Sequence, residues 1–178
     1  MTVRDPEVQA LIDKQAITET LMRYSRGLDR HDRAVLESIY WPDAVDDHIT
    51  YRGDAKGFID HAFEFTKDVR TSHMLLNILI ELVSDTRAVS ETYYIGYHDL
   101  PGAIGREDFS MGGRYLDIHE KRGNEWRIIK RVLTCDWYTR APGTARWGEG
   151  LLAPLKTRGE QGPDDPLYRM LAEARGEG

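Results

Sequence analysis

The fold class follows from the stretch Ser72–His98, which reads SHMLLNILIELVSDTRAVSETYYIGYH. Leucine, isoleucine, valine, threonine and tyrosine dominate it on both sides of the polar segment Ser84–Arg87, as in two β-strands joined by a turn. Two more strand candidates follow at Phe109–Glu120 and Glu125–Thr139, and the short polar segment between them favours a hairpin. We therefore predict four long antiparallel strands in this part of the chain.

The residues before this stretch have the periodicity of helices. From Val8 to Leu28, apolar residues recur at three- and four-residue spacing, which buries one side of a helix. Asp5-Pro6 provides an N-cap and a proline at the first helical position. We expect the helical region to break at Gly27 and at Asp29–Asp32. Further helices are predicted at Ala34–Tyr40, Lys56–Thr66 and Pro166–Arg175. Helices followed by antiparallel strands predict an α+β fold.

Length and composition narrow the class of protein. The chain has 178 residues, of which 40% are apolar and 30% charged, and a formal net charge of −6. This length fits one domain, which we place at residues 1–139, with an extension at 140–178 that wraps the domain, covers a neighbouring subunit or stays mobile. The acidic balance argues against nucleic-acid binding. Without a signal-peptide pattern or a long apolar run, we expect a cytoplasmic protein that does not bind a membrane.

A few polar residues have positions that suit chemistry. His73 opens a strand and Asp29 follows the first helix. A carboxylate can accept the Nδ1 hydrogen of a histidine and leave Nε2 free as a base. Arg131 lies among apolar residues of the last strand, together with Ile129, Leu133, Cys135 and Trp137, and a buried charge there needs a partner or a ligand. A histidine that opens a strand is more often structural than catalytic, so the pattern leaves both interpretations open.

Other polar clusters give weaker signals. The segment that holds Asp43, Asp46, Asp47 and His48 offers ligands for a divalent metal, but we favour a solvated turn after the second helix and expect no metal site. The pairs His98-Asp99 and Asp117/His119 are expected at the surface, near strand ends.

The remaining signals argue against a cofactor and against a reactive thiol. Gly112-Gly113 lies within a strand and not before a helix, so no phosphate-binding loop is predicted and no cofactor is expected. The single cysteine, Cys135, excludes an intramolecular disulfide, and we expect a small buried hydrophobe.

Five segments, in this order, resemble the SnoaL-like branch of the nuclear transport factor 2-like superfamily. They are Ala16–Asp29, Tyr40–Val45, Tyr51–Gly53, Ser72–Asn77 and Trp126–Arg131. The similarity covers about residues 7–139. It implies a cone-shaped, curved and mostly antiparallel sheet, an α+β barrel covered by the N-terminal helices, with a pocket inside. The lyases of this family, which include dehydratases and a dehydrochlorinase, use an Asp–His pair in that pocket.

The resemblance implies roles for individual residues. The catalytic pair falls on His73 and Asp29, the pocket arginine on Arg131, and further catalytic positions on Tyr24 and Tyr94. Substrate contacts are expected from Asn77, Tyr115, Leu133, Trp41 and Trp137.

The resemblance also implies an activity. We expect a cofactor-independent lyase that removes water from a small hydrophobic, aromatic and hydroxylated substrate, with or without carbon–carbon cleavage and loss of formaldehyde, as from lignin-type diarylpropane diols. Tyr24 stands where the dehydrochlorinase has a lysine and Tyr94 where it has an aliphatic residue, so loss of halide is less expected. An isomerase or polyketide-type cyclase is the first alternative, and a non-catalytic ligand-binding or scaffold protein is the second. A homodimer or homotrimer is expected through the outer face of the sheet, where Leu116 and Ile118 lie.

Overall fold

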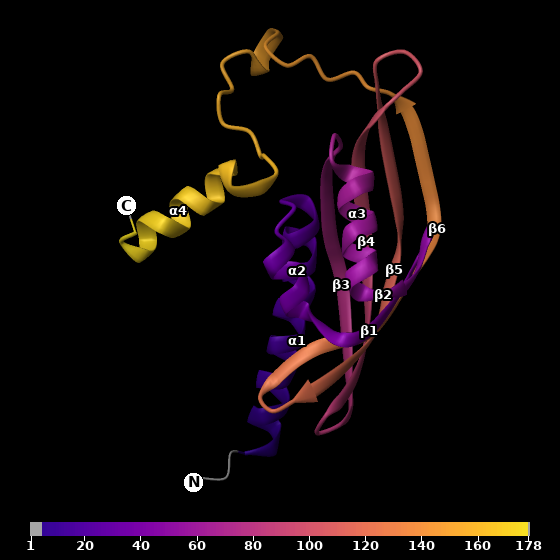
Figure 1. Ribbon diagram of the computed structural model, residues 1–178, viewed down its shortest axis with the longest axis vertical. Helices are drawn as coiled ribbons and strands as arrows, with labels where there is room; N and C mark the ends of the chain where they lie inside the picture. The colour runs from indigo at the N-terminus through magenta and orange to yellow at the C-terminus, as the bar shows by residue number, and fades with distance from the viewer. Residues whose placement is uncertain (1–4, 178) are drawn as a thin grey trace.

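The computed structural model describes residues 5–177, which contain six strands and four α-helices. The strands form one sheet in the order β2-β1-β6-β5-β4-β3, curved along its length, with β2 and β3 at its edges (Figure 1). Neighbouring strands are antiparallel except β1 and β6, which are parallel. The strands are β1 (Tyr40–His48), β2 (Tyr51–Asp54), β3 (Arg70–Ser84), β4 (Arg87–Pro101), β5 (Arg106–Arg122) and β6 (Glu125–Pro142).

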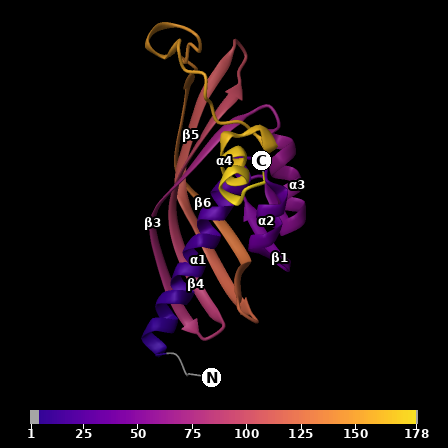
Figure 2. The same ribbon diagram turned by 90° about the vertical axis from the view of Figure 1, so that its left-hand side faces the viewer.

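Three helices pack against one face of this sheet (Figure 2). They are α1 (Pro6–Asp29), α2 (Arg33–Ile39) and α3 (Ala55–Thr66). The carboxylate of Asp5 accepts the backbone N–H of Glu7 at 2.8 Å and so caps α1, as its sequence predicts. The α+β fold with a curved sheet covered by N-terminal helices is confirmed. The sheet itself stays open and does not close into a barrel.

Gly27 does not break α1, contrary to the prediction. The helix continues through Gly27 to Asp29, and the chain turns at His31, which has a φ of +51°. A Cβ atom at Gly27 would lie 2.6 Å from Cγ of the fully buried Leu36 in α2. The glycine therefore allows α2 to approach α1 closely. It interrupts the apolar pattern of α1 because two helices pack there, and not because the helix ends.

The predicted solvated turn at residues 43–48 is wrong, because this segment is the strand β1. It pairs with β2 on one side and with the distant β6 on the other. Asp43 forms an ion pair with Arg122 and Asp47 forms one with Arg52. Ala44 and Asp46, which lie on the other face of the strand, are buried in the core. Local sequence could not show the pairing with β6, which lies more than 80 residues further along the chain.

Strands β4 and β5 extend further than predicted, and this changes the environment of three polar residues. His98, Asp117 and His119 were expected at the surface, but all three are buried, at 9%, 1% and 0% exposure. They lie inside long strands on the face that the helices cover. His119 is bound to the hydroxyl of Ser90 at 2.9 Å, and Asp117 is bound to Arg131.

Two register shifts in the β5–β6 pair break the simple alternation of β6. One lies between Ile118 and His119, so that Ile128 and Arg131 are both buried, although they are three residues apart. The other lies between Gly112 and Gly113, close to Cys135. Cys135 is exposed, which contradicts its predicted burial, because this end of β6 extends beyond the part of the sheet that the helices cover.

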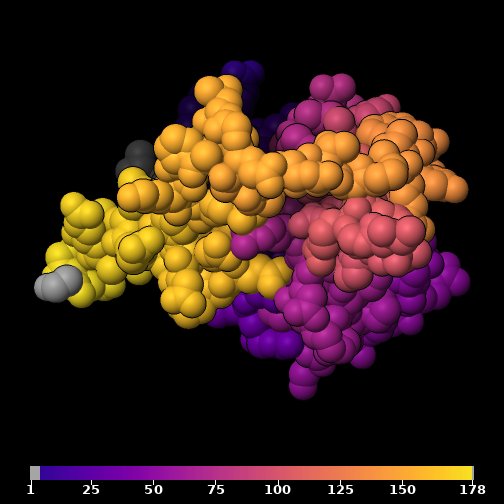
Figure 3. All heavy atoms as spheres, turned by 90° about the horizontal axis from the view of Figure 1, so that it is seen from above, coloured from indigo at the N-terminus to yellow at the C-terminus, as the bar shows by residue number. Residues whose placement is uncertain are grey.

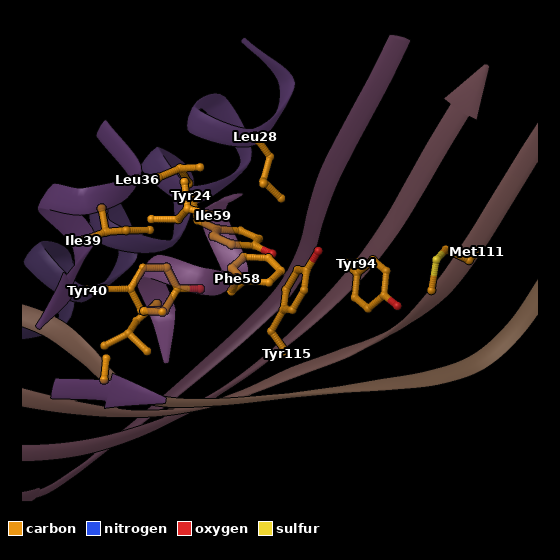
Figure 4. Close-up of a cluster of buried hydrophobic side chains, with 13 residues drawn as sticks. Tyr24, Leu28, Leu36, Ile39, Tyr40, Phe58, Ile59, Tyr94, Met111 and Tyr115 are labelled. Atoms are coloured by element: carbon orange, nitrogen blue, oxygen red, sulfur yellow. The ribbon is translucent and has the colours of Figure 1, made fainter. Parts of the chain in front are cut away.

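The core between helices and sheet is rich in aromatic residues. Figure 4 shows Tyr40, Phe58, Tyr115 and Tyr94 in a row along the inner face of the sheet, with Tyr24 of α1 above them. A second, smaller cluster forms where Ile17 and Leu21 of α1 meet Trp126 of β6. The side of the row toward Tyr94 and Met111 borders the cavity that forms the candidate site.

The chain after β6 crosses the end of the molecule and returns to the helices (Figure 3). Gln161 donates its amide hydrogens to the carbonyl oxygens of Thr66 and Val69 at the end of α3, at 3.0 and 2.9 Å. The helix α4 (Pro166–Arg175) lies where it was predicted, and its Tyr168 hydroxyl donates to Asp32 at 2.7 Å. Of the helices within residues 5–177, none offers an apolar stretch long enough to cross a bilayer.

Candidate active site

A cavity of about 220 Å³ lies between α3 and the inner face of the sheet. Its wall is mostly apolar, with contributions from Leu28, Phe58, Ala62, Phe65, Met111 and Leu133. Four of the six histidines of the chain also line it: His48, His61, His73 and His98. Such a concentration of imidazoles in an apolar wall suits proton transfer to a ligand that is shielded from water.

The structure brings His73 and Asp29 together. Asp29 is the last residue of α1, and its carboxylate accepts from His73 Nδ1 at 2.7 Å and from the His73 backbone N–H at 2.9 Å. The hydroxyl of Thr71 donates to the same carboxylate at 2.8 Å. With Nδ1–H bound to Asp29, the lone pair of the neutral ring is on Nε2, and the ring lies in the cavity wall.

The carboxylate of Asp29 remains ionised although it is buried. Burial alone would raise its pKa, but the hydrogen bonds from the His73 ring and backbone and from Thr71, together with the charge of His73, hold the pKa of Asp29 below its usual range. An ionised Asp29 can stabilise the imidazolium that forms when His73 takes a proton. The pair therefore has the geometry of a base with its orienting carboxylate.

His98 is a second ring beside His73, with the two ring centres 5.4 Å apart in an edge-to-face arrangement. Burial, and then the charge of His73, lower the pKa of His98 to about 4, so this ring is neutral at neutral pH. A Cβ atom at Gly96 would lie 3.5 Å from Cδ2 of His73 and 3.4 Å from Cε1 of His98. Both rings thus lie against the open space that this glycine leaves.

A further histidine–aspartate pair, His48 with Asp46, was missed by the sequence analysis. His48 Nδ1 is hydrogen-bonded to Asp46 Oδ1, and its Nε2 lies 3.0 Å from the hydroxyl of Tyr24. Tyr40 donates its hydroxyl to the other oxygen of Asp46 at 2.7 Å. The signal that could have revealed the pair is the alternation of Ala44, Asp46 and His48, which share one face once the segment is recognised as a strand.

Arg131 has the partner that its burial requires. Its Nε and Nη2 each donate to a carboxylate oxygen of Asp117 at 2.7 Å, and both side chains are fully buried. Its guanidinium lies over the rings of Tyr24 and Tyr115, 3.9 and 4.4 Å from their centres. Arg131 and Tyr24 therefore lie behind the residues that line the cavity, and they support its wall.

The other predicted residues divide into two groups. Tyr94, Tyr115 and Leu133 line the cavity; the two tyrosine rings stack at 4.4 Å, and the Tyr94 hydroxyl donates to the Thr134 carbonyl at 3.2 Å. Three residues lie outside the cavity: Asn77, Trp41 and Trp137.

Each of these three has a physical reason to lie elsewhere. Asn77 falls at the register shift of β3 between Leu75 and Ile78 and is exposed. Trp41 donates its Nε1–H to the Glu120 carbonyl at 2.9 Å. Trp137 packs on Gly112, where a Cβ atom would lie 2.4 Å from its ring.

No metal site replaces this arrangement within residues 5–177, since three or more histidine, cysteine, aspartate or glutamate side chains nowhere converge there as ligands. His48 and Asp46 are bound to each other and to tyrosine hydroxyls instead. The chemistry that the site offers is therefore proton transfer between a ligand in an apolar cavity and histidines that are each hydrogen-bonded to an aspartate.

Comparison with known proteins places the chain in a family. Residues 9–132 match the SnoaL-like domain, whereas no curated protein sequence matches the chain. A type-2 hexachlorocyclohexane dehydrochlorinase has a similar structure, with a TM-score of 0.71 and 20% identity over 79% of this chain and 97% of that one. A candidate scytalone dehydratase from Novosphingobium aromaticivorans DSM 12444 has a TM-score of 0.65 and 23% identity over 79% of this chain and 93% of its own.

An uncharacterised protein from Caulobacter vibrioides with a cystatin-like fold is also similar, with a TM-score of 0.57 and 19% identity over 68% of this chain and 88% of its own. These identities are low, so the solved structures show a common fold. The domain match covers more than half of the chain, and the protein belongs to the SnoaL-like family.

Proposed function

We propose that this protein is a lyase that removes water from a small hydrophobic, hydroxylated substrate by histidine–aspartate acid–base catalysis. The proposal depends on one observation, the contact of His73 Nδ1 with Asp29 in the wall of an apolar cavity. Asp29 orients the ring and leaves Nε2 to exchange a proton with a ligand. Two proteins with this fold are named for eliminations, a dehydrochlorination and a dehydration, which supports a lyase over other reactions.

The lining of the cavity supports an aromatic substrate. Phe58, Phe65, Tyr94, Phe109 and Tyr115 contribute ring surface to a wall that also holds aliphatic side chains and histidines. Aromatic side chains bind flat apolar ligands through stacked and edge-to-face contacts. An apolar wall also excludes water, so that a developing charge on the substrate interacts more strongly with the few polar groups present.

The proposed reaction begins when His73 Nε2 takes a proton from the carbon next to the carbinol carbon. The C–H electron pair forms the new double bond, and the C–O pair leaves with the oxygen, which takes up a proton and departs as water. A phenolic diarylpropane diol opens a second course. Loss of its benzylic hydroxyl together with the phenolic proton, as water, gives a quinone methide. Deprotonation of the primary alcohol then cleaves the adjacent carbon–carbon bond and releases formaldehyde, and the electron pair of that bond forms the new double bond and restores the aromatic ring.

The test uses a panel of phenolic carbinols and diarylpropane diols, with products identified by mass spectrometry and formaldehyde measured separately. We expect a product lighter by one water, or by water and formaldehyde where a diol follows the second course. His73→Ala and Asp29→Asn should each lower turnover by about 10²–10⁴-fold. Ser72→Ala is the matched control, because Ser72 is the exposed neighbour of His73 on β3 and should leave turnover unchanged.

Each other outcome has a definite meaning. A folded His73→Ala protein with wild-type turnover contradicts the proposed base. A product with the mass of the substrate identifies an isomerase or cyclase. Saturable binding of panel members without any turnover identifies a ligand-binding protein.

A further inference from the structure

The pair of His48 and Asp46 extends into a chain of four hydrogen-bonded side chains. Tyr40 and His48 bind opposite oxygens of Asp46, and Tyr24 binds the far nitrogen of His48. Of these four residues, only His48 lines the cavity, and 16% of its side chain is exposed. Its ring stacks on Phe58 with centres 4.2 Å apart, which fixes the ring plane. These hydrogen-bonded side chains therefore present one imidazole to the ligand, whereas Asp46, Tyr40 and Tyr24, which hold that imidazole, are buried.

The two ring nitrogens of His48 both have partners that can accept a hydrogen bond. Nδ1 faces the carboxylate of Asp46, and Nε2 faces the oxygen of Tyr24. A doubly protonated ring needs two acceptors, and the Asp46 carboxylate and the Tyr24 oxygen can supply them, whereas Tyr24 donates to Nε2 when the ring carries one proton. His73 differs, since Asp29 binds its Nδ1 and no protein group within residues 5–177 binds its Nε2. The contacts of His48 can therefore accommodate two ring protons, whereas the Nε2 of His73 has an open position for a proton to enter.

The carboxylates support the same division. Asp29 receives two neutral donors besides the ring, from Thr71 and the His73 backbone, whereas the side chain of Asp46 receives one, from Tyr40. Asp46 is 1% exposed, and the nearby guanidinium of Arg131 is already engaged by Asp117. A buried carboxylate needs compensation by donors or by a cation. Asp46 therefore depends more on a positively charged His48 than Asp29 depends on a charged His73.

We propose that His48 is a second catalytic residue, the acid that protonates the departing oxygen, and that Asp46, Tyr40 and Tyr24 are its positioning residues. This inference rests on the proposed lyase reaction. While His73 Nε2 takes the proton from carbon, the C–O bond breaks, and His48, whose ring lines the cavity, gives up its hydrogen bond to Tyr24 and passes the Nε2 proton to the oxygen. Tyr24 then turns its hydroxyl to donate to the neutral ring. Solvent returns one proton from His73 to His48, and no other reactant is needed.

The proposal fits the groups that face each ring. Around His48 these are Asp46 on its own strand, Tyr24 on α1, Tyr115 on β5 and the Arg131–Asp117 pair behind the two tyrosines. Burial, and then the neighbouring Tyr40, raise the pKa of Tyr24 well above its usual value. The phenol therefore keeps its hydrogen, and only the direction in which the O–H bond points changes. Around His73 they are Asp29 and the neutral His98.

The first test needs no substrate. Nitrogen NMR of protein labelled with ¹⁵N-histidine distinguishes protonated from unprotonated ring nitrogens, and the signals lost in His48→Gln and His73→Gln assign the two rings. At a pH where Nε2 of His73 carries no hydrogen, we expect both nitrogens of His48 to carry one. Asp46→Asn should convert His48 to a singly protonated ring, whereas Asp47→Asn, on the opposite face of β1, should not. A His48 ring that is singly protonated in the wild type overturns the proposal.

The second test varies the leaving group. A hydroxyl needs a proton to depart, but a chloride in the same position does not. His48→Gln should therefore lower the elimination of water by about 10²–10⁴-fold and leave the elimination of chloride close to wild type. His73→Ala should lower both, because both need the base.

The two proposals fail in different ways. If His73→Ala retains wild-type rates, the proposed lyase mechanism fails, and the NMR result still decides whether His48 holds two protons. If His73→Ala is impaired while His48→Gln slows water and chloride loss equally, His48 only shapes the cavity and the acid assignment is wrong. His48→Gln should unfold at a lower temperature than Asp47→Asn, because Asp46 loses its cation, so the rates are compared at a temperature where circular dichroism shows both variants folded.

Discussion

At the scale of single residues, the site combines ionised carboxylates with imidazoles in different electrostatic environments. Asp29 is buried yet keeps its pKa low, because His73 and Thr71 supply hydrogen bonds that outweigh the cost of burial. His98, only one ring away, has no carboxylate at hydrogen-bond distance within residues 5–177, and its pKa is lowered to about 4. The neutral His98 therefore places no second positive charge beside the base His73.

The lowered pKa of His98 makes the stability of the fold depend on pH in the acid range. An unfolded histidine has a pKa of about 6.5, so below that pH the unfolded chain binds a proton that folded His98 refuses until about pH 4. The free energy of unfolding therefore falls as pH drops from about 6.5 to about 4, by up to about 3 kcal/mol from this residue. Urea denaturation measures the free energy of unfolding at each pH. Plotted against pH, the values for wild type and His98→Gln should converge as pH falls. Parallel curves would contradict the buried neutral ring.

At the scale of elements, local sequence predicts what local interactions determine. The start of α1, the bounds of α3 and α4 to within one residue, and the existence of β3–β6 follow from the apolar periodicity, the caps and the turns, since each signal lies within the element itself. The strand β1 is different, because Pro42 and three aspartates are typical of a loop and only the pairing with β6 makes the segment a strand.

The same limit applies to the candidate site. His73 and Asp29 were found because the resemblance gave their positions, and the structure places them in contact. His48 and Asp46 were missed, because the face of a side chain has no meaning until the segment is known to be extended. The register shifts in β5–β6 and β3 likewise moved Trp137 and Asn77 away from the positions that simple alternation predicts.

The crossing of α1 and α2 yields a prediction at this scale. Gly27→Ala places a methyl group 2.6 Å from Cγ of the buried Leu36, so the two helices must separate or Leu36 must leave its position. We expect a loss of about 1–3 kcal/mol in the free energy of unfolding, measured with urea. Leu36→Ala removes the clashing group, and in the double variant the effect of Gly27→Ala should therefore be much smaller. Additive losses would show that the close approach does not limit the packing.

At the scale of the whole molecule, one face of the sheet is covered by helices and the other exposes apolar side chains. Exposed residues on β3 and β4 include Met74, Leu76, Leu79, Val89 and Tyr93. The register places Leu116 opposite Glu91 and Ile118 opposite Val89, so the apolar outer face continues onto β5. β3 is also a 15-residue edge strand whose outer edge is unpaired in the described sheet. Proteins rarely leave both features exposed to water.

The occupant that we predict for this face is a second copy of the chain, in a homodimer or homotrimer. The central charges of the face, Glu91 and Arg114, already pair with each other at 3.0 Å, so an identical surface can approach without stranding a charge. Light scattering should give a multiple of the 20.4 kDa chain mass. Leu79→Lys, which adds a charge at a side chain that is 70% exposed, should shift the protein toward the monomer without unfolding it. Lys56→Glu, which changes an exposed charge on α3 on the helix-covered side of the sheet, is the control, and a wild-type monomer would contradict the prediction.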